Sequence, residues 1–474
     1  MLIKSVSNIS FSLFPNNKRN RCLIGCYEVA VMFFKINSFI SSFVWGAPML
    51  AAFLGTGAFL TFKSRFYQII GVGNWLSKTL GAAFKSRKSK RADGSVSQFS
   101  ALASSLAACL GTGNIIGVAT AISSGGPGAV FWMLVSGILG MMTCCCENIL
   151  ALKYRIKDFD GKWLGGPMYY IENGLGMRKT AKLYAFLLLG ASLGMGNMTQ
   201  ANAVSQSLAS FGADTLPVAA VLSAVLVFAV SGGVARISRI SEKLVPLLSA
   251  GFIVACFAVI IKNIGNLLPS IALILECAFT PKAFSGYTMA KAVRYGVSRG
   301  VFSNEAGLGS NTLIHACADC DEPGVQGMWG IVEVGIDTVF MCTLTALAIL
   351  TSGVWQAMPS LTGVELCSAV FESVFGARGK WILNICTCLF AFGTLLAWSY
   401  YGKSGAVYLF GKRSGKYYSA VYVAAAFAGC LMSLESVWTV SDTLNGLMAV
   451  PNLFAVISLS GEALNLLEKA RRKI

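Results

Sequence analysis

Two apolar stretches of the chain contain short glycine-rich segments with polar side chains, a combination that can bind ions and small solutes within a membrane. Residues 111–114 are Gly-Thr-Gly-Asn, and residues 302–309 are Phe-Ser-Asn-Glu-Ala-Gly-Leu-Gly. Glycines let a helix unwind, which frees backbone N–H and C=O groups. In hydrocarbon, such groups are tolerated only where protein or a water-filled cavity satisfies them. Broken helices at corresponding positions of two halves point to the binding site of a secondary transporter.

The first segment offers ligands of both polarities. The half-helix that restarts near Asn114 directs free N–H groups and the positive end of its dipole at the break, where a carboxylate binds well. Carbonyl groups freed from the preceding half-helix suit a cation such as Na⁺. A second interpretation is close helix packing through small residues. A phosphate loop would need a lysine and a preceding strand, which this segment lacks.

The second segment places Glu305 in an apolar run, next to Asn304. An acidic residue within a membrane is a functional-site candidate. Glu305 can bind a proton or a cation, or it can cap the start of a half-helix, where its charge meets the dipole and free N–H groups. We favour the capping role, and Arg299 is a nearby partner for an acidic residue.

Two further pairs of residues are expected to face the same cavity. Asn197 and Gln200 are three residues apart in one apolar stretch, and Thr394 and Trp398 are four apart in another, so each pair shares a helix face. A tryptophan wall with a hydroxyl below it suits a small apolar side chain and an ion. The alternatives are interhelical hydrogen bonds for the two amides and a place at the membrane interface for Trp398.

The composition is that of a polytopic membrane protein. Of 474 residues, 55% are hydrophobic and 12% are charged, whereas a soluble domain carries roughly 25% charged residues. The net charge of +17 comes from short loops between apolar runs, the pattern of cytoplasmic loops in membrane proteins. A nucleic-acid binder would instead carry its basic residues on a soluble face, so we expect no nucleic-acid partner.

Neither the 15 cysteines nor the single histidine forms a recognisable reaction centre. Most cysteines lie inside apolar runs, where they act as small hydrophobes. No further zinc-ligand spacing follows the Cys-x-x-Cys at 317–320. We favour a packing or helix-end role for His315 over proton coupling. Without a nucleophile–base set or a Walker loop, we expect no enzyme activity, no metal beyond a coupling ion and no ATP drive.

About 11 segments are long and apolar enough to span a bilayer as helices. They are 38–62, 98–122, 128–152, 183–211, 215–231, 243–262, 289–315, 328–352, 383–410, 417–434 and 440–460. We therefore predict an all-α polytopic membrane protein with two five-helix repeats, each beginning with a broken helix. An odd number of spans per repeat gives the repeats opposite orientations. The predicted divisions are an N-terminal extension at 1–37, an extra transmembrane helix at 38–62, a first repeat at 98–262, a linker at 263–288, an inverted second repeat at 289–460 and a cytoplasmic tail at 461–474.

Basic residues are concentrated on one side of this topology. The opposite side carries only Lys262, Lys282, Arg378 and Lys380. The positive-inside rule then places the C-terminus in the cytoplasm. We expect the protein to lie in the plasma (inner) membrane. The basic extension 1–37 breaks this pattern. It is a targeting segment, a cytoplasmic arm with a different first span, or an extension absent from the mature protein.

Sequence blocks from about residue 45 to the C-terminus resemble the alanine or glycine:cation symporter family. The blocks are 111–114, 125–133, 165–171, 242–246, 302–307 and 398–402. Together they are specific, whereas a lone Gly-x-Gly is not. The resemblance implies a LeuT-like fold of two inverted five-helix repeats with an extra helix before them. It also implies Na⁺-driven, sometimes H⁺-driven, uptake of alanine or glycine, and in some members of D-alanine.

The resemblance further implies roles for individual residues. The expected substrate-binding residues are Thr112, Gly113, Asn197, Gln200, Phe302 and Trp398. The expected cation-binding residues are Gly111, Asn114 and Thr394. A structural or coupling role is expected for Asn304 and Glu305.

The chain departs from the family pattern in three places. Lys403 stands where the family usually has an acidic residue, Gly393 replaces a usual serine, and the run Cys144–Cys146 is atypical. Gly393 bears on the ion site and weakens the choice of Na⁺ over H⁺.

We therefore predict a Na⁺-coupled symporter that imports a small neutral amino acid by alternating access, embedded in the lipid bilayer. Na⁺ is the expected coupling ion, and no other cofactor and no partner protein are expected. Two alternatives stay open: an H⁺-coupled amino-acid symporter and a transport-inactive amino-acid sensor. A channel would need a continuous pore, often with rings of charge. A membrane enzyme would need clustered histidine, aspartate or metal ligands. The sequence indicates neither arrangement.

Overall fold

The computed structural model describes residues 32, 35–82, 95–158, 160–279, 288–432 and 434–472, without the side chains of 434–439. The predicted extension at 1–37 therefore lies almost entirely outside the described residues. In chain order the helices are α3 (Ala47–Lys63), α4 (Tyr67–Ile70), α5 (Val72–Leu76), α7 (Gln98–Cys109), α8 (Ile116–Gly125), α9 (Gly128–Lys153), α10 (Pro167–Leu175), α11 (Arg178–Leu193), α12 (Thr199–Ala209), α13 (Thr215–Ser231), α14 (Gly233–Lys262), α15 (Leu267–Phe279), α16 (Met289–Asn304), α17 (Thr312–His315), α18 (Pro323–Val334), α19 (Thr343–Ser352), α20 (Val354–Ala357), α21 (Gly363–Phe375), α22 (Ala377–Phe410), α23 (Ser414–Leu431), α24 (Leu434–Ser458) and α25 (Ser460–Arg472).

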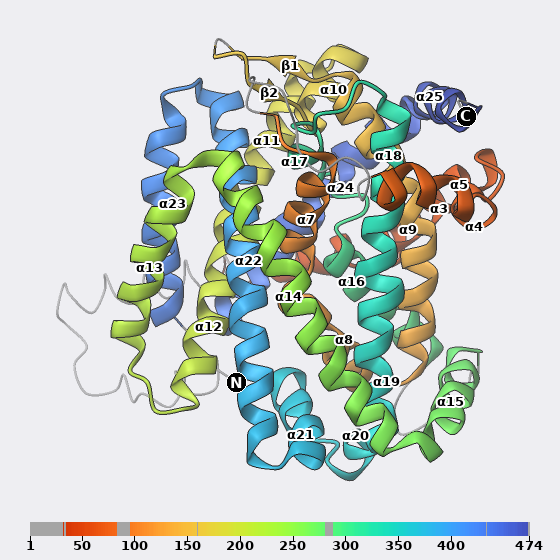
Figure 1. The fold of residues 1–474 in the computed structure, drawn as a ribbon, viewed down its shortest axis with the longest axis vertical. Helices are drawn as coiled ribbons and strands as arrows, with labels where there is room; N and C mark the ends of the chain where they lie inside the picture. Colours follow the sequence, from red (N-terminus) through yellow and green to blue (C-terminus); the bar gives the residue numbers. More distant parts are fainter. Residues whose placement is uncertain are drawn as a thin grey trace.

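Short 3₁₀ or π segments interrupt or join these helices. They are η2 (Ser77–Gly81), η3 (Thr112–Asn114), η4 (Gly194–Met198), η5 (Ile264–Asn266) and η6 (Gly335–Cys342). The antiparallel strands β1 (Ile156–Lys157) and β2 (Trp163–Leu164) form a small hairpin. Figure 1 shows the long helices side by side, with the hairpin, α10, α25 and the C-terminus at one end and α15, α20 and α21 at the other.

Six helices among the described residues are long and apolar enough to cross a membrane. They are Lys35–Lys63, Gly128–Lys153, Gly233–Lys262, Pro323–Ser352, Ala377–Phe410 and Val440–Ser458. The bent pair α7 and α8 is a seventh candidate, and α13 is apolar but shorter. The protein is therefore a helical multi-pass membrane protein. Helices also occupy the other predicted spans, but the count of 11 and the inverted repeats stay predictions.

Some helices extend beyond the apolar stretch that predicts them. The observed α14 begins at Gly233 and α22 at Ala377, each several residues before the predicted span. Hydropathy marks only the part of a helix that lies in hydrocarbon, whereas backbone hydrogen bonding continues past the interface. The predicted boundaries are therefore too short at these ends.

The first apolar helix breaks at the predicted glycines. α7 ends at Cys109, Gly111 adopts an extended conformation (φ −110°, ψ −152°), and the chain resumes through η3 into α8. The two halves are bent by 59°. The break leaves the carbonyls at the end of α7 and the amides at the start of η3 available to other partners.

The second break follows α16. Glu305 adopts the left-handed conformation (φ 56°), and Gly307 and Gly309 also have positive φ (90° and 75°). An L side chain rarely takes such angles, whereas glycine does so at little cost. The glycines therefore let residues 305–311 turn before the short helix α17 begins at Thr312.

Small residues hold the helices around the breaks closely together. A Cβ at Gly296 of α16 would lie 2.3 Å from the Ala129 carbonyl oxygen of α9, and a Cβ at Gly327 of α18 would lie 2.8 Å from the Cys145 carbonyl oxygen. Such small-residue contacts let membrane helices approach closely. The buried cysteine run therefore forms part of the α9–α18 contact, and both α16 and α18 pack against α9.

Candidate functional site

The two helix breaks meet in the middle of the molecule. A Cβ at Gly113 would lie 3.5 Å from Phe302 Cδ1 and 3.5 Å from Ser303 Cα. Gly113, Phe302 and Ser303 are all buried. The first break therefore lies directly against the last turn of α16, and residues far apart in the sequence can bind one solute.

Most of the predicted residues around the first break are brought together. Thr112 Oγ1 lies 3.3 Å from Gln200 Oε1 on α12. Gly111 lies beside Thr394 of α22, whose hydroxyl is 3.2 Å from the Ala107 carbonyl and 3.1 Å from the Ala108 carbonyl. The carbonyls that the break frees thus share a polar cluster with a threonine hydroxyl and a glutamine amide, which suits a cation and a polar solute.

The tight fit at Gly111 leads to a first prediction. A Cβ at this position would lie 2.6 Å from Thr394 Oγ1, so Gly111→Ala should push the threonine off the α7 carbonyls. We expect the initial rate of substrate uptake to fall roughly 5- to 150-fold, because overpacking of this kind costs about 1–3 kcal/mol. Gly117→Ala is the matched control, since a Cβ there meets nothing within 4 Å. Equal uptake by the two variants would contradict the prediction.

Asn114 contacts an acidic residue that was not selected from the sequence. Its Nδ2 donates to Asp337 Oδ1 at 2.8 Å, while its Oδ1 is buried and has no hydrogen-bond partner among the residues that the structure describes. Asp337 Oδ2 accepts hydrogen bonds at 2.8 Å from both Ser303 and Thr338. Amide, hydroxyl and carboxylate oxygens are the ligands that hard cations prefer. The cluster can therefore hold a monovalent cation between the two breaks.

Glu305 connects the second break to α22. Its Oε1 accepts a 3.0 Å hydrogen bond from Trp398 Nε1, and its Oε2 accepts one from the Ser310 hydroxyl. The residue terminates α16 rather than starting α17, so the favoured capping role at a half-helix start is wrong. Trp398 is fully buried, which also argues against a place at the membrane interface. The carboxylate acts as a bridge that holds the turn against α22.

Asn197, predicted to bind substrate, and Asn304, predicted to have a structural or coupling role, both have partners outside the first break. Asn197 Nδ2 donates to the Tyr422 carbonyl of α23 at 2.6 Å, which matches the interhelical alternative rather than contact with a break. Asn304 Nδ2 donates to Thr338 Oγ1 at 3.0 Å, and its Oδ1 accepts from the Ala306 amide at 3.0 Å. Asn304 therefore supports the turn between α16 and α17.

Two further buried acids contact the second break. Glu147 of α9 accepts hydrogen bonds from the Gly307 amide at 3.0 Å and from Asn452 Nδ2 at 2.5 Å. It thereby satisfies a backbone donor that the break exposes. Glu333 of α18 accepts from Ser105 and from Asn311, the latter at 3.2 Å. Both acids lie inside apolar runs, so the rule that marked Glu305 would have found them.

His315 completes the Glu333 cluster. Its Nε2 is 3.0 Å from Glu333 Oε2, its Nδ1 is 2.6 Å from Gln326 Nε2, and the three side chains are fully buried. This agrees with the packing role expected for the histidine.

The cluster leads to a second prediction. We expect His315→Ala to lower the stability of the protein by about 3 kcal/mol, because removing one partner leaves a buried carboxylate poorly compensated. The loss would appear as a lower midpoint of thermal unfolding in detergent. His315→Gln is the control, since its amide can still donate to Glu333 and should cost less. An unchanged midpoint for His315→Ala would refute the role.

Taken together, two facing helix breaks that carry buried carboxylates, amides and hydroxyls within an apolar helical bundle define a secondary transporter, not an enzyme. A solved structure described as MhsT in complex with L-phenylalanine has a similar fold. The two superpose with a TM-score of 0.57 at 12% sequence identity, over 79% of this chain and 98% of that one. At that identity the likeness concerns the fold alone.

The chain belongs to the sodium:alanine symporter family, whose model matches residues 30–474. The sodium/alanine symporter AgcS of Methanococcus maripaludis is 40% identical over 429 residues, covering 89% of this chain and 94% of that protein. A probable sodium/glutamine symporter, GlnT of Bacillus subtilis, is 35% identical over 421 residues, covering 88% and 86%. The family expected from the sequence blocks is therefore confirmed.

Proposed function

We propose that the protein is a Na⁺-coupled symporter that imports a small neutral amino acid, with alanine, glycine and D-alanine as the candidate substrates. The observation that carries the proposal is the meeting of the two breaks around Asn114 and Asp337. A negatively charged cluster there faces the start of a half-helix, where free amides favour a carboxylate. A cation and an amino acid can therefore bind side by side. The two relatives, a sodium/alanine symporter and a probable sodium/glutamine symporter, support Na⁺ and an amino acid as the pair.

In the proposed cycle Na⁺ binds near Asn114 and Asp337. Gly111 and Thr394, at the first break, are further candidate ligands of the cation. The amino-acid carboxylate then binds the amides near Thr112 and Gly113. Gln200 hydrogen-bonds the substrate, while Phe302 and Trp398 restrict the size of its side chain. Asn304 and Glu305 hold the second break in the shape that this site requires. Only the carrier with both ligands or with neither switches access from one side of the membrane to the other. With one ligand alone, the charged or polar groups that bind the other ligand lack their partner.

The topology is part of the proposal. We assign 98–262 and 289–460 to two inverted repeats, 38–62 to the extra helix and 263–288 to the linker. Lys262, Arg378 and Lys380, all predicted to lie outside, lie on α14 and α22 near α21, whereas the basic C-terminal helix α25 lies at the opposite end (Figure 1). This separation supports a cytoplasmic tail at 461–474 and an external α21.

The decisive experiment is uptake of labelled L-alanine into proteoliposomes with and without an inward Na⁺ gradient. We expect accumulation that requires the Na⁺ gradient and is inhibited by unlabelled glycine. Uptake driven by a proton gradient alone would instead identify an H⁺-coupled symporter. Binding of alanine without accumulation under either gradient would identify a sensor. Competition by glycine and glutamine then ranks the substrates by size, since one methylene is worth about 1–3 kcal/mol, and competition by D-alanine measures the preference for one enantiomer.

A further inference from the structure

A cavity of about 390 Å³ lies next to the first break, and residues of α8, α12, α21 and α22 line it. Its lining includes Ile116, only two residues beyond Asn114. α21 packs on the start of α8, since the Cys367 thiol donates to the Ile115 carbonyl at 3.5 Å. The cavity therefore adjoins the start of α8, next to the first break, and its α21 wall belongs to the end of the molecule where Figure 1 shows α21. Its volume falls within the range of small-molecule sites.

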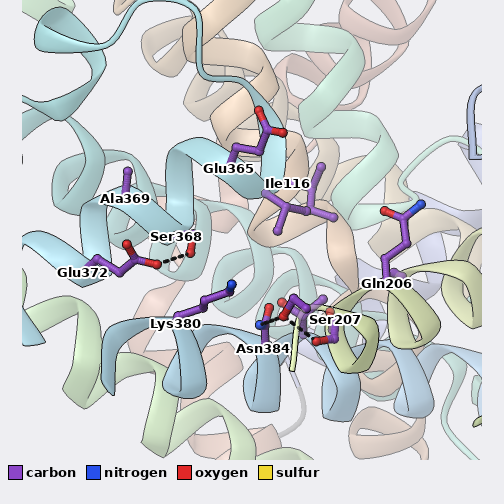
Figure 2. A pocket seen from close by; sticks show the side chains of 13 residues that line it. Ile116, Gln206, Ser207, Glu365, Ser368, Ala369, Glu372, Lys380 and Asn384 are labelled. Carbon is purple, nitrogen blue, oxygen red and sulfur yellow. Dashed lines mark hydrogen bonds between the residues drawn. The ribbon is translucent and has the colours of Figure 1, made fainter. Parts of the chain in front are cut away.

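The charged groups in this cavity have both signs. Lys380 of α22 and the carboxylates Glu365 and Glu372 of α21 all line it. Figure 2 shows Glu372 and Ser368 on one side and Asn384 and Ser207 on the other, with Lys380 between them in this view. Glu372 accepts a 3.0 Å hydrogen bond from Ser368. Within the described residues, no ion pair or hydrogen bond engages the side chains of Lys380 and Glu365.

A buried hydroxyl provides a second, independent observation. Thr387 lines the cavity and is 1% exposed, yet its Oγ1 has no hydrogen-bond partner among the described residues. A buried polar group without a partner is costly, and a ligand in the cavity can supply the missing partner. The neighbouring Asn384 is 5% exposed and donates to Ser210 at 2.7 Å, so this wall is polar and ordered.

The charge pattern selects the class of ligand. A simple anion would meet two carboxylates, a simple cation would meet the ammonium group, and an apolar solute would engage none of the three charges. A zwitterion with its two charges close together matches both signs. We propose that this cavity is a second binding site for a free α-amino acid, with its carboxylate at Lys380 and its ammonium group at Glu365 or Glu372. The site holds the next substrate in front of the break, and the inference rests on the proposed amino-acid transport.

The test compares Lys380→Gln with Arg378→Gln by equilibrium dialysis of labelled L-alanine against the purified full-length protein in Na⁺. Arg378 is the matched control, because it is an exposed basic residue on the same helix that does not line the cavity. We expect the wild type and Arg378→Gln to bind a second alanine that Lys380→Gln loses. In uptake assays, Lys380→Gln should raise KM about fivefold with an unchanged maximal rate, the effect of one partly exposed charge contact.

Further measurements separate the possible failures. Glu365→Gln should reproduce the loss of the second alanine, and propionate, which lacks the ammonium group, should not displace it. A single bound alanine in a wild type that transports normally would overturn the second site and leave the symporter intact. Retention of the second alanine by both Lys380→Gln and Glu365→Gln would also overturn it. Absence of any alanine binding to the wild type would overturn both proposals.

Discussion

Replacing Asp337 with asparagine is expected to raise the Na⁺ concentration for half-maximal alanine uptake about 100-fold, a loss of roughly 2.7 kcal/mol in cation binding. The carboxylate is fully buried and lies 2.8 Å from Asn114 Nδ2 and 2.8 Å from the Ser303 hydroxyl. Asparagine keeps the size and one acceptor oxygen but removes the negative charge that attracts the ion. The measurement is the Na⁺ dependence of initial uptake rates in proteoliposomes.

The control for this substitution is Asp214→Asn, which makes the same change at an exposed residue before α13. It should leave the Na⁺ dependence and the thermal unfolding midpoint unchanged. A folded Asp337→Asn protein with the Na⁺ dependence of the wild type would show that Asp337 only packs the two breaks. The coupling ion would then have to bind elsewhere.

Removing either partner of the Glu305–Trp398 hydrogen bond is expected to lower alanine uptake about 30-fold, since a hydrogen bond to a charged group is worth roughly 1.5–3 kcal/mol. This bond is 3.0 Å long and fully buried, and it joins the turn after α16 to α22. Without it, the left-handed turn at Glu305 loses its side-chain contact with α22 and keeps only the contact with Ser310. Glu305→Leu removes the acceptor and Trp398→Phe removes the donor, and each variant retains most of the packing volume of the residue that it replaces.

A double-mutant cycle gives the sharper result. If the two residues act through their mutual bond, the double variant should be no worse than either single variant, with a coupling energy of about 2 kcal/mol. Trp381→Phe on the same helix is the matched control, because Trp381 is largely exposed and distant from the turn. Additive losses in the double variant would mean that Glu305 and Trp398 serve separate functions.

The local features of the site could be predicted well from the sequence, and the reason is physical. Gly307 and Gly309 mark the second break because glycine adopts left-handed conformations that other residues avoid, and Gly111 marks the first because a Cβ there would collide with Thr394. The apolar stretches mark the helices because only continuous hydrophobicity is compatible with a bilayer. Boundaries were less accurate, since helices such as α14 continue beyond the hydrocarbon region.

The partners of the polar residues could not be predicted in the same way. Glu305 was expected to cap a half-helix start, yet it terminates α16 and binds Trp398. For Asn197 the sequence left substrate contact and an interhelical hydrogen bond open, and its amide donates to a carbonyl of α23. In both residues, helical spacing identifies a face of the helix but not the helix that packs against that face. The choice among neighbours depends on how the whole bundle assembles.

By itself, the sequence determined a helical membrane protein of the sodium:alanine symporter family with two glycine breaks, because hydropathy, glycine content and motif blocks are local properties. Only the tertiary structure decided that Asn114 meets Asp337, 223 positions away, and that Glu147 and Glu333 surround the second break. It also placed Lys380, Glu365 and the buried Thr387 around one cavity. These contacts form because small residues let the helices pack closely. Side chains far apart in the chain are thereby brought together, and their separation in the sequence does not predict their distance in space.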